Sequence, residues 1–297
     1  MDRIDAMRVF TRVTERRSFT LAAEDLGLPR STLSDVVKQL EARLGVRLLQ
    51  RTTRQIRPTL EGEAYYQRCL SILAEIEDAE AAFSGAKPKG VLRVDVQGTL
   101  ARNWVLPRMP EFFQAYPDIE IRMSEGDRLV DLIREGVDCV LRVGVPQDSD
   151  MIARRLAMLE EATLASPGYI AAHGRPEVPG DLQDGHCMVG FHSSATGGVL
   201  PLLFTMDGQV SRMTLPSILS VTGADSYYAA ASLGFGLIQC PRYRAEADLG
   251  SGRIVEVLPD YPPPPTPVSV LYPRNRQLSP RVRVFVDWLA AVFERRG

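Results

Sequence analysis

The sequence predicts an α/β protein with a helical N-terminal part, one long helix and a larger C-terminal part in which strands alternate with helices. Three observations carry this prediction. Two short amphipathic segments flank a break at residues 27–29, an apolar stripe at helical spacing runs from Thr59 to about Gly85, and strand-like apolar runs begin at Val91. A chain of 297 residues is long enough for two or three domains with cores of their own.

The N-terminal part contains two short helices separated by a tight break at Gly27-Leu28-Pro29. Their apolar residues recur every three or four positions, so the helices present faces that can pack together. The residues expected on these faces are Leu21, Ala22 and Leu26 in the first helix, Leu33, Val37, Leu40 and Leu44 in the second, and Ile4, Met7, Phe10 and Val13 in a helix that precedes both. This arrangement is a helix-turn-helix.

The second helix presents polar and basic residues near its N-terminus, where a helix-turn-helix reads the major groove of DNA. The residues expected to contact DNA there are Arg30, Ser31, Thr32, Ser34 and Lys38. Arg30 can reach the hydrogen-bond acceptors of a guanine. Asp35 would repel a phosphate, so it either orients Arg30 or Lys38 or accepts a hydrogen bond from a cytosine.

Short alternating stretches flank Arg51, Thr53 and Arg54 and predict a two-stranded wing beside the helices. The basic tip of such a wing follows a phosphate backbone or enters the minor groove. Residues 1–60 hold 12 Lys and Arg against 7 Asp and Glu, a net charge of +5, whereas residues 61–297 hold 23 against 30, a net charge of −7. Charge alone also fits an ordinary solvated surface, but together with the motif it favours double-stranded DNA as a partner.

The order and spacing of several residues in this part match a known pattern. These residues are Ala22-Ala23, Leu33, Ser34, Leu40-Glu41, Leu44-Gly45 and Arg51-Thr52, and through them the chain resembles the LysR-type transcriptional regulators, over its whole length. Two positions depart from the family pattern. Pro29-Arg30-Ser31 stands where members often carry Ser-Gln-Pro, and Asp35 stands where they carry a basic residue, so we expect base readout to differ.

The resemblance implies a winged helix-turn-helix DNA-binding domain at residues 1–58, a linker and dimerisation helix with a hinge at 59–89, and an effector-binding domain at 90–297. The last is expected to be a two-lobed domain like the type 2 periplasmic binding proteins, with lobe 1 at about 90–161 and 267–297 and lobe 2 at about 162–266. The implied partners are a DNA operator, a small-molecule effector, further copies of the chain in a homodimer or homotetramer and, for an activator, RNA polymerase.

The long helix should begin at Thr59 as its cap, with Glu61 and Glu63 at the positive end of its dipole. Its apolar stripe, which we expect to mediate dimerisation, consists of Tyr65, Cys69, Ile72, Ile76, Ala79 and Phe83. Such a helix most simply pairs with its copy in a second chain. The alternative is that the stripe packs on the chain's own globular domain. Residues 86–90 end the helix and form a hinge.

The C-terminal part alternates between strand and helix patterns, which predicts a parallel sheet. The expected strands are Val91–Val96, Ile119–Met123 and Cys139–Val143, the helices between them are Trp104–Tyr116 and Leu129–Glu135, and a later hairpin turns at Asp207-Gly208 before a final helix from Pro280.

Ligands of open α/β sheets bind at the carboxyl ends of strands, against helix N-termini. Thr99 is the main candidate there, because a hydroxyl among backbone N–H groups suits a carboxylate, and the resemblance implies an effector contact at this position. Further candidates in neighbouring loops are Leu100, Arg128, Arg142, Ser193, Ser194, Ala224, Asp225 and Ser226. The alternative for Thr99 and Ser226 is that they only cap helices. We expect a small, anionic effector.

The sequence contains none of the common nucleophile, phosphate-loop, zinc or dinucleotide motifs, so we expect no enzyme, cofactor or metal. The four cysteines are widely spaced, which indicates buried free thiols. Two alternatives stay open: a ligand-independent architectural DNA-binding protein, and a two-lobed small-molecule-binding protein or enzyme. No apolar run reaches the ~20 residues that span a bilayer and the N-terminus lacks a signal-peptide pattern, so we expect a cytoplasmic protein without a membrane partner.

Overall fold

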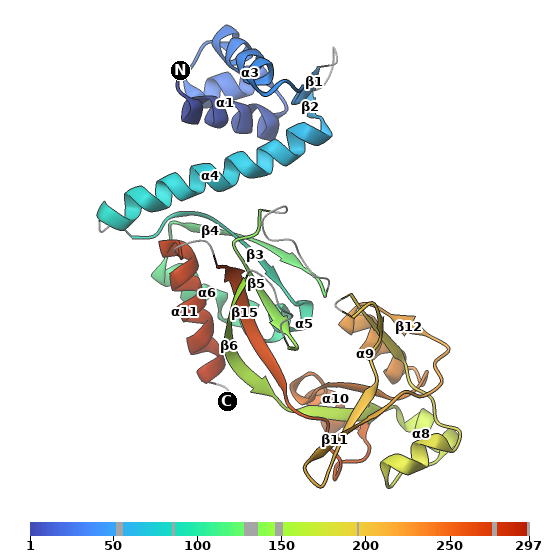
Figure 1. Ribbon diagram of the computed structural model, residues 1–297. Coiled ribbons are helices and arrows are strands. Elements are labelled where there is room, and N and C mark those ends of the chain that lie inside the picture. Colours follow the sequence, from blue (N-terminus) through green and yellow to red (C-terminus); the bar gives the residue numbers. More distant parts are fainter. Residues whose placement is uncertain are drawn as a thin grey trace.

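The computed structural model describes residues 1–51, 56–84, 87–127, 136–145, 151–194, 196–274 and 278–295. Figure 1 shows three parts in chain order: a small helical head, the long helix α4 and a larger domain of two lobes. Helix α4 lies between the head and the first lobe.

The head consists of α1 (Arg3–Arg16), α2 (Phe19–Leu26), α3 (Arg30–Leu44) and the antiparallel pair β1 (Leu49–Arg51) and β2 (Ile56–Pro58). Ser18 begins α2 by accepting a hydrogen bond from the Leu21 N–H at 3.3 Å, and Gly27 ends it with a φ of +62°. The helix-turn-helix and the wing strands predicted from the sequence are therefore confirmed.

The three helices of the head share one apolar core. Its most deeply buried members include Phe10, Val13, Ala22, Leu33, Val37 and Leu40. The prediction that Leu21 and Leu44 belong to this core is wrong, because Leu21 is 45% exposed and Leu44 is 40% exposed. The buried stripe of α2 runs through Phe19 and Ala23, a different side of the helix from Leu21, and Leu44 lies in the last turn of α3 beside exposed residues.

Helix α4 spans Leu60–Ser84. Thr59 caps it as predicted, since the Thr59 hydroxyl accepts a hydrogen bond from the Gly62 N–H at 2.9 Å. The first part of the apolar stripe contacts the head of its own chain. Cys69 is fully buried in the head core and the Tyr65 ring centroid lies 5.5 Å from that of Phe10. The expectation that Tyr65 and Cys69 face a second chain is thus wrong, because α4 packs across α1 there.

The first lobe is built on a five-stranded sheet of order β4-β3-β5-β15-β6. Its strands are β3 (Gly90–Val96), β4 (Ile119–Glu125), β5 (Cys139–Val143), β6 (Met151–Leu159) and β15 (Thr266–Pro273). Strands β3, β4 and β5 run parallel as predicted, but β15 is antiparallel to both β5 and β6. The sheet is therefore mixed, because the last strand returns from the second lobe in the opposite direction.

The helix expected at Trp104–Tyr116 is broken into short pieces. They are α5 (Gly98–Leu100), a π-helical turn η1 (Ala101–Val105), a 3-10 turn η2 (Leu106–Arg108) and α6 (Met109–Ala115). Pro107 and Pro110 cannot donate the backbone hydrogen bonds of a continuous helix. The pieces pack with α11 (Pro280–Glu294) on the sheet around Trp104, Phe112, Phe285 and Leu289. The helix expected at Leu129–Glu135 lies outside the described residues.

The second lobe holds three small sheets and several short helices. Its strands are β7 (Glu161–Ala165), β8 (Gly190–Ser193), β9 (Gly198–Val199), β10 (Leu202–Met206), β11 (Gln209–Met213), β12 (Ser220–Val221), β13 (Ile238–Pro241) and β14 (Val255–Glu256). Its helical elements are α8 (Pro167–His173), η3 (Pro179–Gln183), α9 (Ala224–Ser232), η4 (Arg242–Arg244) and α10 (Glu246–Ser251). Asp207 and Gly208 form the predicted hairpin turn, with φ values of +49° and +75°.

Two adjacent strands connect the lobes. Leu159 at the end of β6 is the ladder partner of Thr266 at the start of β15, so the chain leaves and re-enters the first lobe at one place. Among the helices that the structure describes, none is both long and apolar enough to cross a membrane.

Candidate DNA-binding surface and lobe junction

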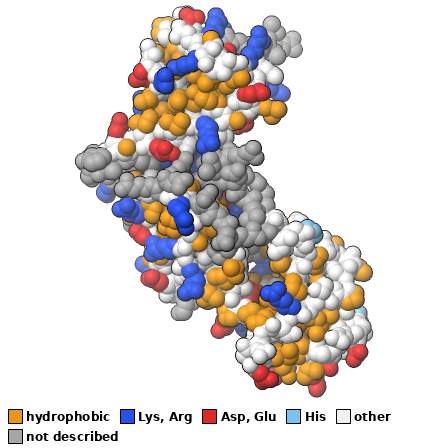
Figure 2. All heavy atoms as spheres, in the orientation of Figure 1, with side chains coloured by type: hydrophobic (Ala, Val, Ile, Leu, Met, Phe, Trp, Pro, Cys, Tyr) orange, Lys and Arg blue, Asp and Glu red, His pale blue; other side chains and the backbone are white. Residues whose placement is uncertain are grey.

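Helix α3 has one buried face and one polar face. Leu33, Val37 and Leu40 hold it against the head core, which directs Arg30 and Lys38 to solvent. Ser31 is also exposed, whereas Thr32 and Ser34 are half-buried. Figure 2 shows lysine and arginine side chains on the surface of the head. Arg30, Ser31 and Lys38 thus lie on the accessible side of one helix, whereas Thr32 and Ser34 are only partly accessible.

Asp35 lies near Lys38, with 3.9 Å between the carboxylate Oδ1 and the ammonium Nζ. Both side chains are about two-thirds exposed, at 67% and 64%. Of the roles considered for Asp35, this geometry agrees with orienting Lys38.

The wing is attached to α3 by a residue that the sequence analysis missed. The Glu41 carboxylate Oε1 accepts hydrogen bonds from the N–H groups of Leu48 and Leu49, at 2.8 and 3.0 Å. These bonds fix where β1 leaves the helix. The available signal was the place of Glu41 in the family pattern, where Leu40-Glu41 was matched without a role. Thr53 and Arg54, which the sequence predicted for the wing tip, lie outside the described residues, as does the side chain of Arg51.

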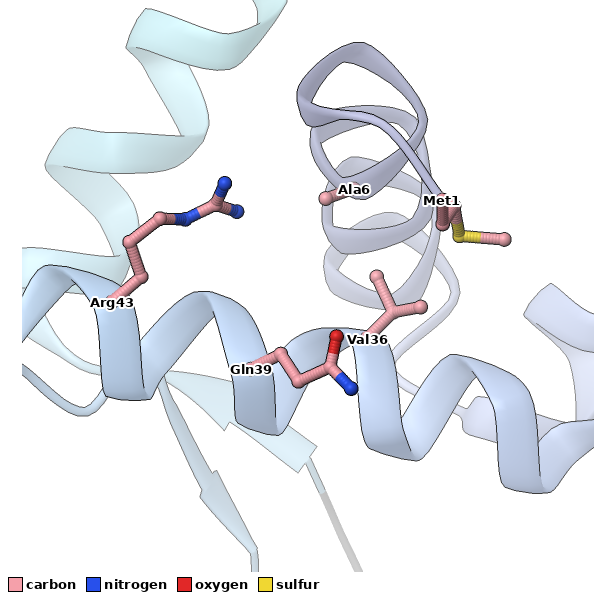
Figure 3. Close-up of a pocket in the computed structure, with 5 residues that line it drawn as sticks. All are labelled: Met1, Ala6, Val36, Gln39 and Arg43. Atoms are coloured by element: carbon pink, nitrogen blue, oxygen red, sulfur yellow. The ribbon is translucent and has the colours of Figure 1, made fainter.

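A shallow pocket of about 240 Å³ lies between α1 and α3 (Figure 3). It is lined by Ala6 of α1, by Val36, Gln39 and Arg43 of α3, and by Met1, which precedes α1. Gln39 and Arg43 are exposed side chains of α3. The pocket therefore belongs to the head and not to the strand ends at which we expected an effector.

Thr99 lies in α5, just after β3 of the first lobe, and is 4% exposed. Its hydroxyl donates to Gln97 Oε1 at 2.6 Å and lies 3.0 Å from the hydroxyl of Tyr243 in the second lobe. Gln97 Oε1 also accepts from the Leu100 N–H at 3.0 Å, so Gln97 and not Thr99 caps α5. Thr99 therefore joins the two lobes where they meet.

Asp127, which the sequence analysis did not select, makes hydrogen bonds across this junction. Its Oδ1 accepts from Gln97 Nε2 at 3.0 Å, and its Oδ2 accepts from the backbone N–H of Ala224 at 3.0 Å. The Ser194 hydroxyl donates to the Asp127 carbonyl oxygen at 3.4 Å. Ala224 and Ser194 belong to the second lobe, whereas Asp127 and Gln97 belong to the first.

Asp225 forms a second contact between the lobes. Its carboxylate pairs with Arg102 of the first lobe and, at 2.7 Å, with Arg244 of the second. Burial raises the pKa of Asp225, but the hydrogen bonds and charges of Arg244 and Arg102 outweigh burial and leave the pKa below its ordinary value. Asp225 is therefore a charged group that both lobes neutralise.

Two predicted effector contacts, Leu100 and Arg142, serve the first lobe itself. Leu100 is fully buried in the core of the first lobe. Arg142 pairs with the buried carboxylate of Asp95, so its charge is used within the first lobe. The cap alternative for Ser226 is wrong, because Gly223 precedes α9 and Ser226 is exposed. Ser193 is half-buried in β8, and Arg128 lies outside the described residues.

The four cysteines are free thiols, and Cys69, Cys139 and Cys240 are buried. Burial raises the pKa of Cys69 to about 11 and that of Cys240 to about 12, so these thiols stay protonated and unreactive. Among the described residues, no group of three or more His, Cys, Asp or Glu side chains is arranged to hold a metal ion.

Two family models match this chain. The bacterial regulatory helix-turn-helix protein of the lysR family matches residues 4–63, and the LysR substrate binding domain matches residues 85–294. The chain belongs to the LysR family of transcriptional regulators. It is thus a LysR-type regulator with a DNA-binding and an effector-binding domain.

Relatives agree with this assignment over nearly full length. The uncharacterized HTH-type transcriptional regulator YhjC of Escherichia coli is 38% identical over 299 residues, 99% of each chain. An HTH-type transcriptional repressor of Pseudomonas aeruginosa is 37% identical, over 99% of this chain and 93% of its own.

Solved structures agree as well. CrgA, a LysR-type transcriptional regulator from Neisseria meningitidis, is 30% identical with a TM-score of 0.60, over 97% of this chain and 98% of its own. The Vibrio cholerae virulence activator AphB has the same fold, with 24% identity and a TM-score of 0.59 over 98% and 99% of the two chains. LysR-type regulators bind DNA and small-molecule effectors and form oligomers.

Proposed function

We propose that this LysR-type regulator binds a pseudo-palindromic operator through α3 and the wing, and that a small anionic molecule between the lobes changes its transcriptional output. The proposal of operator binding rests mainly on the polar face of α3. Arg30, Ser31 and Lys38 are exposed on a helix whose opposite face is fixed in the head core. On a rigid support of this kind, a small number of side chains is enough to select a base sequence.

We propose the same division of the chain as the sequence suggested: a DNA-binding domain at residues 1–58, a linker at 59–89 and an effector-binding domain at 90–297. Base readout would come from Arg30, Ser31, Thr32 and Ser34, and phosphate contacts from Lys38, Arg51, Thr53 and Arg54. Because DNA is the ligand, we place the protein in the cytoplasm. The chain would act without a cofactor and without catalysing a reaction.

The second half of α4 supports a homodimer or homotetramer. Ile72 is 39% exposed and Ile76 is half-buried on this helix, and Ala79 is exposed one turn further. Apolar side chains on an unburied helix face favour association with another copy. Phe83 would extend the seam, although its side chain lies outside the described residues. An activating form would also contact RNA polymerase.

The anionic character of the effector is inferred from the donors where the lobes meet. The Ala224 N–H at the start of α9, the Gln97 amide and the Thr99 hydroxyl lie at the same junction. Helix N-termini and amide donors favour carboxylates. Ser193, Ser194 and Ser226 would close on the molecule from the second lobe.

Footprinting on the DNA upstream of its own gene and its divergent neighbour tests the DNA part. We expect two protected half-sites whose centres lie about 10 base pairs or a multiple apart. Thermal unfolding with a panel of small carboxylic acids tests the effector part, because a ligand of the folded state raises the midpoint. Thr99→Phe should abolish the shift but leave the footprint intact. Unchanged stabilisation of Thr99→Phe would place the effector elsewhere.

A further inference from the structure

A carboxylate of the chain itself bridges the two lobes. Asp127 lies just after β4 in the first lobe. One of its carboxylate oxygens accepts from Gln97 Nε2 and the other from the Ala224 N–H of the second lobe, both at 3.0 Å. Each oxygen is thus held by one lobe.

The donor from the second lobe has a particular chemical character. Ala224 is the first residue of α9, a helix of nine residues, so its N–H has no acceptor within the helix. Its N-terminal position also carries the positive end of the helix dipole. Gly223, which precedes it, has no side chain that could supply a cap. The Asp127 carboxylate satisfies this N–H in place of a local cap.

The Gln97 side chain connects this carboxylate to Thr99. Gln97 donates through Nε2 to Asp127 and accepts through Oε1 from the Thr99 hydroxyl at 2.6 Å. The Thr99 hydroxyl in turn contacts the Tyr243 hydroxyl of the second lobe at 3.0 Å. The proposed effector contact and the internal carboxylate are therefore parts of one hydrogen-bonded chain.

We propose that Asp127 is an internal clasp: its carboxylate holds the second lobe against the first, and an effector carboxylate competes with it for the same donors. This proposal rests on the proposed effector site. Effector binding is then an exchange of one carboxylate for another. It releases Asp127 and lets the lobes move, while the ion pair of Asp225 with Arg102 keeps them connected. A neutral analogue of the effector has no carboxylate and therefore does not displace Asp127 from these donors.

Chemical rescue tests the clasp without knowledge of the natural effector. In Asp127→Ala the donors remain but their carboxylate is gone, so sodium formate should raise the thermal midpoint relative to sodium chloride at equal ionic strength. We expect the apparent dissociation constant for formate to be about tenfold lower in this variant than in the unmodified protein, which is an ordinary size for a coupling between competing groups.

Two variants serve as controls. Asp127→Asn fills the same space with a neutral amide, and it should respond to formate no more than the unmodified protein does. Asp260→Ala removes an exposed carboxylate from the loop before β15 and should also behave like the unmodified protein. An equal formate response in all four proteins would overturn the clasp.

Operator binding by the same four proteins separates this proposal from the proposed function. Operator binding that persists while formate fails to rescue Asp127→Ala would refute the clasp alone. Rescue by formate in a protein that shows no preference for any DNA sequence would leave the clasp in place and refute the regulatory function.

Discussion

Two backbone segments approach so closely at the junction of the wing and α4 that there is no room for a side chain at Gly62. A Cβ atom added to Gly62 would lie 1.9 Å from the carbonyl oxygen of Leu48. That carbonyl also accepts the Thr59 N–H at 2.9 Å, so it cannot move away without breaking the start of α4. Gly62 thereby sets how closely the linker helix follows the wing.

Gly62→Ala should therefore lower the free energy of unfolding by about 1–3 kcal/mol, the usual cost of overpacking. Urea unfolding followed by circular dichroism measures this loss. Gly250→Ala is the matched control, because Gly250 lies in α10 with open space around the added methyl group. Alanine there should be neutral or slightly stabilising. Equal stability of both variants would show that the contact with Leu48 is not restrictive.

Glu161 is the first residue of β7, where the chain enters the second lobe, and burial raises its pKa to about 7 despite a hydrogen bond with Thr266. The folded protein therefore keeps a proton that the unfolded chain loses above its ordinary pKa of 4.5. Because the unfolded state binds fewer protons in this range, stability from this group is present at low pH and is lost as the pH rises towards about 7.

Glu161→Gln should abolish this dependence. We expect the variant to be more stable than the unmodified protein at pH 8, by on the order of 1–3 kcal/mol, and equally stable near pH 4.5. Thermal unfolding across this pH range measures the difference. If the two proteins differ in stability by the same amount at every pH, the pKa of Glu161 is the same in the folded and the unfolded state.

At the scale of elements, the sequence predicted those features that local chemistry decides. The helix-turn-helix, the Thr59 cap and the turn at Asp207-Gly208 all depend on neighbouring residues. The breaks within the helix expected at Trp104–Tyr116 were not predicted. Apolar spacing alone does not reveal them, whereas Pro107 and Pro110 do. Asp127 could not be found, since its partners Gln97 and Ala224 lie 30 and 97 positions away.

The stripe on α4 shows why packing is harder to predict than periodicity. Helical spacing identified apolar positions but not the surface that covers each of them. Cys69 is covered by the chain's own head, whereas Ile72 is partly exposed. Arg142 presents the same difficulty, because only the fold reveals the buried Asp95 beside it.

Helix α3 should read bases through Arg30. We expect Arg30→Ala to cost about 1–3 kcal/mol of binding and to relax the preference at one base pair. Lys38→Ala should weaken binding to all sequences alike and reduce its salt dependence, because a lysine is expected to contact phosphate. Titrations against operators with single-base changes at two salt concentrations measure both effects. An unchanged base preference in Arg30→Ala would disprove the assignment.

At the scale of the whole molecule, the linker helix connects a basic head to an acidic two-lobed body, with net charges of +5 and −7 for residues 1–60 and 61–297. It contacts the head through Tyr65 and Cys69 and leaves Ile72 exposed. This division suits a protein in which one part binds DNA, another binds a small molecule and α4 brings two copies together.

Association should therefore depend on the second half of α4. Ile76→Asp would bury an unpaired charge on dimerisation, so the variant should be mostly monomeric and should lose operator binding. Ala64→Asp is the control, since it places an exposed charge in the first turns of the same helix. Light scattering gives the masses. An intact oligomer of Ile76→Asp would exclude this seam as the main dimer contact.

Recognition of a particular DNA sequence is the property on which the proposed function depends. The most direct test is the fluorescence anisotropy of a labelled fragment from upstream of its own gene, titrated with protein beside an unrelated fragment of the same length at physiological salt. We expect the upstream fragment to bind at least about a thousandfold more tightly, as specific operators do. Equal affinity for the two fragments would contradict it.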